Sequence, residues 1–109
     1  MPMYSTSRYC VFEGVAPDPT VGPDPWSGLA EYNFVDSATG ADGTTRLIWV
    51  KTWDHKMYLR LSYDGVNWGD DILFDEEHPP IPLWFSAQKM QVRNETAGNT
   101  AQYSIEGYW

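Results

Sequence analysis

The sequence predicts an all-β protein, an antiparallel β-sandwich that is jelly-roll-like and has seven or eight strands. No stretch of about ten residues shows the spacing of apolar side chains that a helix requires. Short segments of alternating apolar and polar residues recur instead, separated by Gly, Pro and Asn. The chain has 109 residues, which suits one domain with one core.

Residues 1–28 are predicted to form an N-terminal segment with an extended Pro-rich arm, outside a sandwich domain of residues 29–109. A short strand is expected at residues 11–12. Residues 14–28 contain four prolines and three glycines. Proline lacks the amide donor that a helix or a central strand needs, so we expect a polyproline-like arm. A long surface loop is the alternative interpretation.

Alternation of apolar residues predicts the strands of the sandwich. The expected strands are residues 29–35, 44–53, 83–87, 89–94 and 101–109, with loops at 36–43 and 75–82. In the segment 44–53, Leu47, Trp49 and Trp53 share one face. The opposite face is also apolar, which is typical of a central strand.

Residues 57–72 are predicted to form a hairpin with a two-residue turn at Asp64-Gly65. Asp-Gly between alternating apolar residues favours a type I′ turn, in which both central residues have positive φ. The resulting register places Trp68 opposite Leu61 and directs the indole into the core.

The charge of the chain makes nucleic acid and anionic membranes poor partners. The net charge is −8, and residues 64–78 hold six acids and no Lys or Arg. No apolar run is long enough to span a bilayer, and no signal peptide is expected. Cys10 is the only cysteine, so neither a disulfide within the chain nor a cysteine zinc site is expected.

Catalysis and cofactors are not expected from the motifs. His55 and His78 are the only imidazoles, and no nucleophile elbow, phosphate-binding loop or zinc-protease motif is present. A calcium site would draw on Asp64, Asn67, Asp70 and Asp71, but the predicted hairpin spreads these residues along two strands. Turn formation and solvated acids explain them better, although the sequence leaves calcium binding by the acidic loops open.

Carbohydrate binding is the alternative function. Aromatic residues make up 16% of the chain and include six Trp, more than a domain of this size readily buries. Exposed Trp stacks on sugars, while Asp and Asn bind hydroxyl groups. The candidate glycan-binding residues are Trp49, Trp53, Asp64, Asn67 and Asp71.

Two segments resemble known families. The segment SYDGVNW (62–68) resembles the Ser-x-Asp-Gly-x-x-Trp hairpin of discoidin-like sandwiches, many of which bind glycans or surfaces. The segment KMQVRNETAGNTAQYSIEGYW (89–109) resembles the C-terminal hairpin of small β-sandwich proteins on tailed bacteriophage virions. The second resemblance implies a virion accessory protein, a capsid decoration or tail or collar component that binds the major capsid or tail protein.

Such virion proteins are often homotrimers with exchanged arms, which implies self-association through the N-terminal segment. The expected protein interface consists of Tyr9, Phe12, Trp26, Tyr108 and Trp109, with Trp26 as the anchor of the arm. Production in the host cytoplasm and assembly into the virion are expected. Deletion of residues 1–28 is expected to abolish assembly and leave the sandwich folded.

Overall fold

The computed structural model describes residues 9–34 and 45–109, so the loop predicted at 36–43 lies outside the described residues. Within these ranges the chain forms eight strands and no helix, which confirms the all-β prediction. Sheet A contains, in spatial order, β1 (Tyr9–Val15), β8 (Gln102–Tyr108), β3 (Leu47–Trp53) and β6 (Ile81–Leu83). Sheet B contains β2 (Tyr32–Asn33), β7 (Lys89–Asn94), β4 (Met57–Ser62) and β5 (Ile72–Phe74). All pairings are antiparallel.

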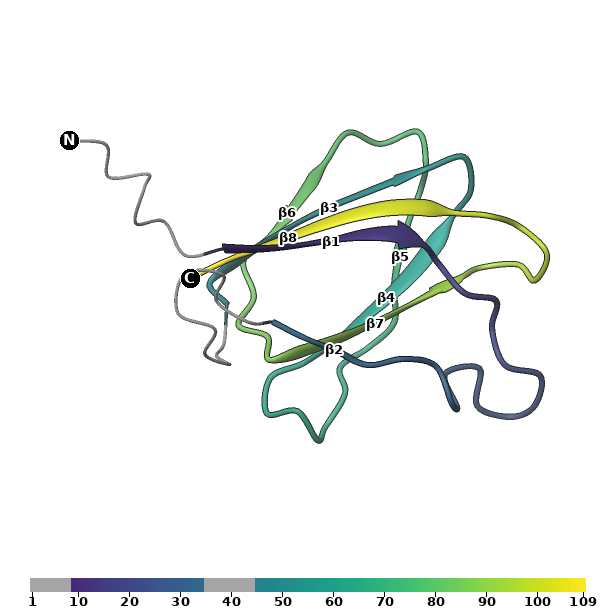
Figure 1. The fold of residues 1–109 in the computed structure, drawn as a ribbon, viewed down its shortest axis with the longest axis horizontal. Helices are drawn as coiled ribbons and strands as arrows, with labels where there is room; N and C mark the ends of the chain where they lie inside the picture. The colour runs from purple at the N-terminus through teal and green to yellow at the C-terminus, as the bar shows by residue number, and fades with distance from the viewer. Residues whose placement is uncertain (1–8, 35–44) are drawn as a thin grey trace.

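The two sheets face each other around one apolar core, as in a β-sandwich (Figure 1). Each sheet contributes the inward side chains of its central strands, in keeping with the period of two along a strand. The fully buried members include Ile48, Val50 and Ile105 from sheet A and Met57, Leu59, Met90 and Val92 from sheet B. The predicted sorting of β3 is confirmed, because Trp49 and Trp53 lie on its outer side.

The first described strand belongs to the sandwich and not to an arm. β1 pairs along its whole length with β8, from Tyr9 opposite Tyr108 to Val15 opposite Gln102. Phe12 points inward. The centroid of its ring lies 5.7 Å from that of the Tyr32 ring and 5.5 Å from that of the Phe34 ring. The strand predicted at 11–12 is too short. Its full length depends on pairing with β8 at the far end of the sequence, which no local pattern shows. Residues 9–15, which belong to the predicted N-terminal segment, therefore form a strand of sheet A.

The Pro-rich segment is a loop that is tied to its own sandwich, so the predicted extended arm is not confirmed. Figure 1 shows it leaving β1, looping at the end of the molecule and returning along sheet B. The amide of Ala16 donates to the carbonyl oxygen of Ala101 at 2.8 Å. The amide of Asn94 donates to the carbonyl oxygen of Pro17, also at 2.8 Å. The side-chain amide of Asn94 also donates to Asp18 Oδ1 at 2.9 Å. These bonds hold the beginning of the loop, residues 16–18, against the sandwich.

Two predicted strands differ in extent. The strand predicted at 29–35 is reduced in the described residues to β2, Tyr32–Asn33. The strand predicted at 83–87 is displaced to β6, Ile81–Leu83, so that only Leu83 is shared and residues 81 and 82 come from the predicted loop 75–82. Pro82 is tolerated there because β6 forms the edge of sheet A, where one side of the strand needs no ladder donor.

The predicted two-residue hairpin is wrong. β4 and β5 pair with Leu59 opposite Ile72 and Met57 opposite Phe74, two residues away from the predicted register. The connection spans residues 63–71. Gly65 has a positive φ of 80°, but Asp64 does not have the positive φ that a type I′ turn requires. The wider loop removes Trp68 from the strand pairing that would have buried it.

Candidate functional site

The outer face of sheet B carries an aromatic–arginine stack, defined as Trp26, Tyr58, Arg60, Trp68 and Arg93. The Arg60 guanidinium carbon lies 4.8 Å from the centroid of the Trp26 ring and 4.6 Å from that of Trp68. The Arg93 guanidinium carbon lies 4.8 Å from the Trp26 ring and 4.3 Å from the Tyr58 ring. The two cations and three rings therefore form alternating layers, an arrangement that cation–π attraction stabilises.

Polar groups fix the edges of this stack. Trp26 Nε1 donates to Asp71 Oδ1 at 3.0 Å, and Arg93 Nη2 donates to Asp71 Oδ2 at 3.3 Å. Arg60 Nε donates to Gln91 Oε1 at 2.7 Å. Burial lowers the pKa of Arg60, whereas Asp24 and Asp71 act in the opposite direction. Both oxygens of Asp71 are thus engaged with the stack.

The stack contains two Trp residues that the sequence analysis singled out. Trp26 is only 4% exposed and packs on its own sheet B, and its role as an anchor on another subunit stays a prediction. Trp68 is half-buried on the outer face and not in the core, so that prediction is wrong. The prediction for Trp68 used the local hairpin pattern, whereas the cation that contacts its ring, Arg60, lies on β4.

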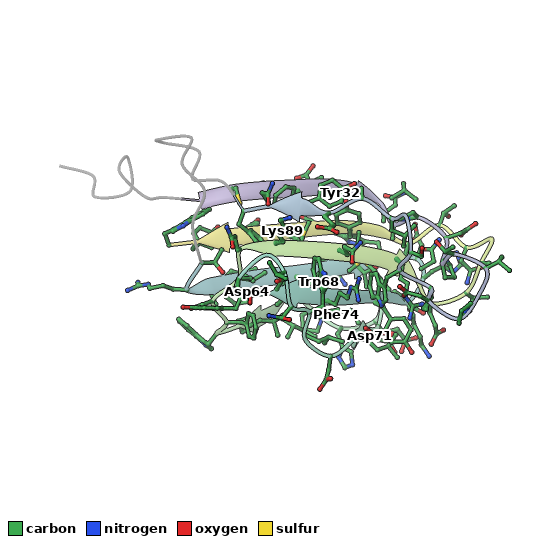
Figure 2. All side chains as sticks on the ribbon, turned by 90° about the horizontal axis from the view of Figure 1, so that it is seen from below. Tyr32, Asp64, Trp68, Asp71, Phe74 and Lys89 are labelled. Atoms are coloured by element: carbon green, nitrogen blue, oxygen red, sulfur yellow. The ribbon has the colours of Figure 1, made fainter. Side chains whose placement is uncertain are left out.

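The loop between β4 and β5 is organised by Asp64. Its Oδ1 accepts the amides of Val66 at 2.8 Å and Asn67 at 2.7 Å, and its Oδ2 accepts the Asn67 side-chain amide at 2.7 Å. These bonds, first those from the Asn67 and Val66 amides, hold the pKa of Asp64 well below its usual range. Figure 2 shows Asp64, Trp68 and Asp71 spread along this connection.

The candidate glycan set is therefore divided between two surfaces. Asp64 and Asn67 hydrogen-bond to each other, and Asp71 holds the stack, all on the side of sheet B. Trp49 and Trp53 lie together on the outer face of sheet A. Among the described residues, no group of three or more His, Cys, Asp or Glu is placed to hold a metal ion.

The outer face of sheet A is hollowed into two adjoining grooves. The first, about 380 Å³, is lined by Trp49, Lys51, Trp53, Ser104 and Glu106 together with Val50 and Pro80. The second, about 430 Å³, runs between β1 and β8 and is lined by Glu13, Gly14, Val15, Trp53, Gln102, Tyr103 and Ser104. Trp53 and Ser104 line both, so the two grooves adjoin, and we call them together the sheet A groove.

Two charged side chains of the sheet A groove are held in place. Lys51 Nζ donates to the carbonyl oxygens of His78 at 2.5 Å and Glu76 at 3.1 Å. The Tyr108 hydroxyl donates to Glu106 Oε2 at 2.6 Å. Sequence reasoning had found Trp49 and Trp53 but missed their polar neighbours on β8. Those neighbours follow only from the register between β3 and β8, which places Lys51 opposite Ser104.

The residues of the predicted protein interface do not form one surface. Phe12 faces the core, and Trp109 packs against the core from the chain end. Tyr108 is half-buried beside Glu106 on sheet A, whereas Trp26 belongs to sheet B. The side chain of Tyr9 lies outside the described residues, although its backbone pairs with Tyr108.

Sequence reasoning missed an exposed aromatic pair, Trp84 and Phe85, in the connection from β6 to β7. Trp84 is 80% exposed and Phe85 is 41% exposed. The connection is held by Thr45, whose hydroxyl donates to the Phe85 carbonyl at 2.9 Å and accepts the Ala87 amide at 3.1 Å. The strand predicted at 83–87 includes both residues, so the sequence analysis did not identify them as exposed loop residues.

Comparison with known proteins identifies no relative of this chain. No family model, no curated protein and no solved structure matches the chain. The part of the chain that the structure describes contains no helix long and apolar enough to cross a membrane.

Proposed function

We propose that this chain is a non-enzymatic structural and interaction protein of a tailed-phage virion, a capsid decoration protein that binds the major capsid or tail protein. The observation that carries the proposal is Trp84, a large apolar side chain that is 80% exposed on a firmly held connection. The resemblance of residues 89–109 to virion accessory proteins supplies the class of partner.

Trp84 has the properties of an interface anchor. Tryptophan is enriched among the few residues that carry most of the binding energy of protein interfaces, because it buries much area with little loss of side-chain entropy. Thr45, which is 1% exposed, fixes the connection on both sides of Ser86. The anchor is therefore preorganised, which lowers the entropic cost of binding.

The order of the strands supports the jelly-roll-like interpretation. Sheet A has the order β1-β8-β3-β6 and sheet B the order β2-β7-β4-β5, so the first and last strands are neighbours. The chain also passes from one sheet to the other at most of its connections. Double-sheet jelly rolls occur in viral capsid and lectin domains, which agrees with a role in a particle.

The proposal does not depend on an exchanged arm. The loop at 16–28 folds onto its own sandwich, and Trp84 is assigned to the capsid or tail protein, so self-association as a homotrimer would use a different surface. Light scattering of the whole chain tests this part directly. A trimer that Trp84→Ala leaves intact supports it, and a monomeric wild type contradicts it.

The main experiment uses particles of the phage that encodes this chain, purified on a density gradient and probed with an antibody. We expect the chain in the particles at a fixed ratio to the major capsid or tail protein. Trp84→Ala, supplied in place of the wild type, should lower occupancy at least tenfold, whereas Trp53→Ala should leave it unchanged. Absence of the wild-type chain from the particles would refute the proposal.

Carbohydrate binding is the second candidate function, and the sheet A groove favours it. Trp84 lines neither part of that groove, so the two candidate functions use different residues. Substitutions can therefore test them separately.

A further inference from the structure

We infer that the sheet A groove binds a neutral oligosaccharide, with Trp49 and Trp53 as stacking surfaces and Lys51, Ser104 and Glu106 as hydrogen-bonding groups. This inference goes beyond the proposed virion role and does not depend on it. The grooves, the exposure of the rings and the fixed charges support it independently.

The shape of the groove suits an extended ligand. Its two parts, about 380 and 430 Å³, are each within the size range of pockets that bind small molecules. Ser104, which lines both parts, lies in register between Glu13 on β1 and Lys51 on β3. Apart from Pro80, the lining residues of the two parts come from β1, β8 and β3, so the sheet A groove spans three neighbouring strands.

The aromatic residues offer the surfaces that sugar rings require. A pyranose presents C–H groups on its faces, and these pack against the electron-rich face of an indole ring. Trp53 is 44% exposed, and Trp49 is half-buried. The two residues are four apart on one strand and hence about 13 Å apart along it. One ligand that stacks on both must contain several linked sugars.

The polar groups of the groove are already held in position before a ligand arrives. Lys51 Nζ donates two hydrogen bonds to backbone carbonyls, and an ammonium group has three protons to donate. Its third proton can therefore reach a sugar hydroxyl without loss of the other two bonds. The Glu106 carboxylate is oriented by the Tyr108 hydroxyl and provides an acceptor on the opposite strand.

The charges of the groove favour a neutral ligand. A cationic ligand on Trp53 would meet Lys51, whose Nζ lies 5.8 Å from the centroid of that ring. A polyanionic ligand would meet Glu13 and Glu106, on a chain whose net charge is −8. A neutral sugar avoids both repulsions and uses the carboxylates as acceptors and the ammonium as a donor.

The test begins with the whole wild-type chain on an array of neutral and anionic glycans. The strongest neutral ligand is then measured by isothermal titration calorimetry. We expect Trp53→Ala and Trp49→Ala each to weaken binding at least tenfold. Trp84→Ala removes a more exposed indole outside the groove and should leave the affinity within twofold of wild type.

Two further measurements keep the test valid if Trp49→Ala fails to fold. Ser104→Phe fills the floor of the groove without removing an aromatic side chain and should also abolish binding. In a 15N-labelled wild-type chain, the indole N–H signals of Trp49 and Trp53 should shift on titration, while that of Trp26, held by Asp71, should not.

Three outcomes would overturn the inference. They are no binding to any neutral glycan, binding to anionic glycans only, and binding that Trp53→Ala and Ser104→Phe leave unchanged. Particle association is measured separately through Trp84→Ala, so failure here leaves the proposed virion role standing, and the reverse also holds.

Discussion

The outer faces of the two sheets have similar side chains but differ in how far one Trp of each pair is covered. Each face presents two Trp and at least one cation, yet Trp26 on sheet B is 4% exposed while Trp53 on sheet A is 44% exposed. The difference arises from the loops. The Pro-rich loop and the 63–71 loop return over sheet B and deliver Trp26 and Trp68 to its surface, whereas among the described residues the outer face of sheet A keeps a groove between β3 and β8.

The cations account for the rest of the difference. The planar guanidinium groups of Arg60 and Arg93 lie within 5 Å of ring centroids and fill the spaces between rings. The compact ammonium of Lys51 binds two backbone carbonyls and lies 5.8 Å from the Trp53 ring. Exposure of an aromatic residue therefore depends on which groups cover it, and composition alone does not determine it.

The largest effect is expected when the cover of sheet B is removed. Trp26→Ala deletes a nearly buried ring that contacts two guanidinium groups and bonds to Asp71, so the free energy of unfolding should fall by about 3–5 kcal/mol. Urea denaturation followed by circular dichroism measures the change. Trp84→Ala is the matched control and should stay within about 0.5 kcal/mol of wild type. If the two substitutions lowered the free energy of unfolding equally, the buried Trp26 would contribute no more to stability than the exposed Trp84, which would contradict this expectation.

A smaller effect is expected when one cation of the stack is changed. Arg93 is 8% exposed, and Arg93→Ala leaves Trp26, Tyr58 and Asp71 without their shared partner, at a cost of about 2–3 kcal/mol. Arg93→Met keeps the volume between the rings and should cost clearly less in the same urea experiment. If both variants lose the same stability, the charge of Arg93 stabilises the stack and the volume that it fills between the rings does not, which would contradict the smaller cost expected for Arg93→Met.

Local sequence patterns predicted the parts of the fold in which neighbouring residues decide the structure. The alternation along β3 placed Trp49 and Trp53 on one face correctly, because side chains on a strand alternate with a period of two. β7 was predicted with its observed bounds, and β8 to within one residue at each end. The two aromatic residues of the sheet A groove, Trp49 and Trp53, could therefore be predicted from the sequence.

The remaining parts depend on contacts between residues far apart in the chain. Trp26 finds its acceptor on Asp71, 45 residues away, and no local pattern encodes that bond. The Asp64-Gly65 pair supports more than one turn, and the side-chain bonds of Asp64 select the wider loop. This wider loop contains Trp68, so the residue is not part of the strand pairing that was predicted to bury it, and its ring lies against Arg60 on the surface of sheet B.

The smallest effect is expected at Asp64, which shapes the loop that carries Trp68 to the stack. The pKa of Asp64 is lowered in the folded state, so its carboxylate contributes stability above the unfolded pKa of about 3.9. That contribution is lost as the pH falls from about 3.9 toward the lower folded pKa. Asp64→Asn keeps an oxygen acceptor but removes the charge, so the variant should be slightly less stable at neutral pH and should approach wild type in acid.

Urea midpoints of wild type and Asp64→Asn, measured from neutral pH down to strong acid, test this expectation. Trp68 fluorescence, recorded in a background where the other exposed Trp residues are replaced by Phe, reports whether the loop still places the indole against Arg60. A gap between the two proteins that stays constant through acid would show that the charge of Asp64 does not hold the loop. Trp68 would then owe its position to Arg60 alone, and the cover of sheet B would depend on the stack and not on the turn.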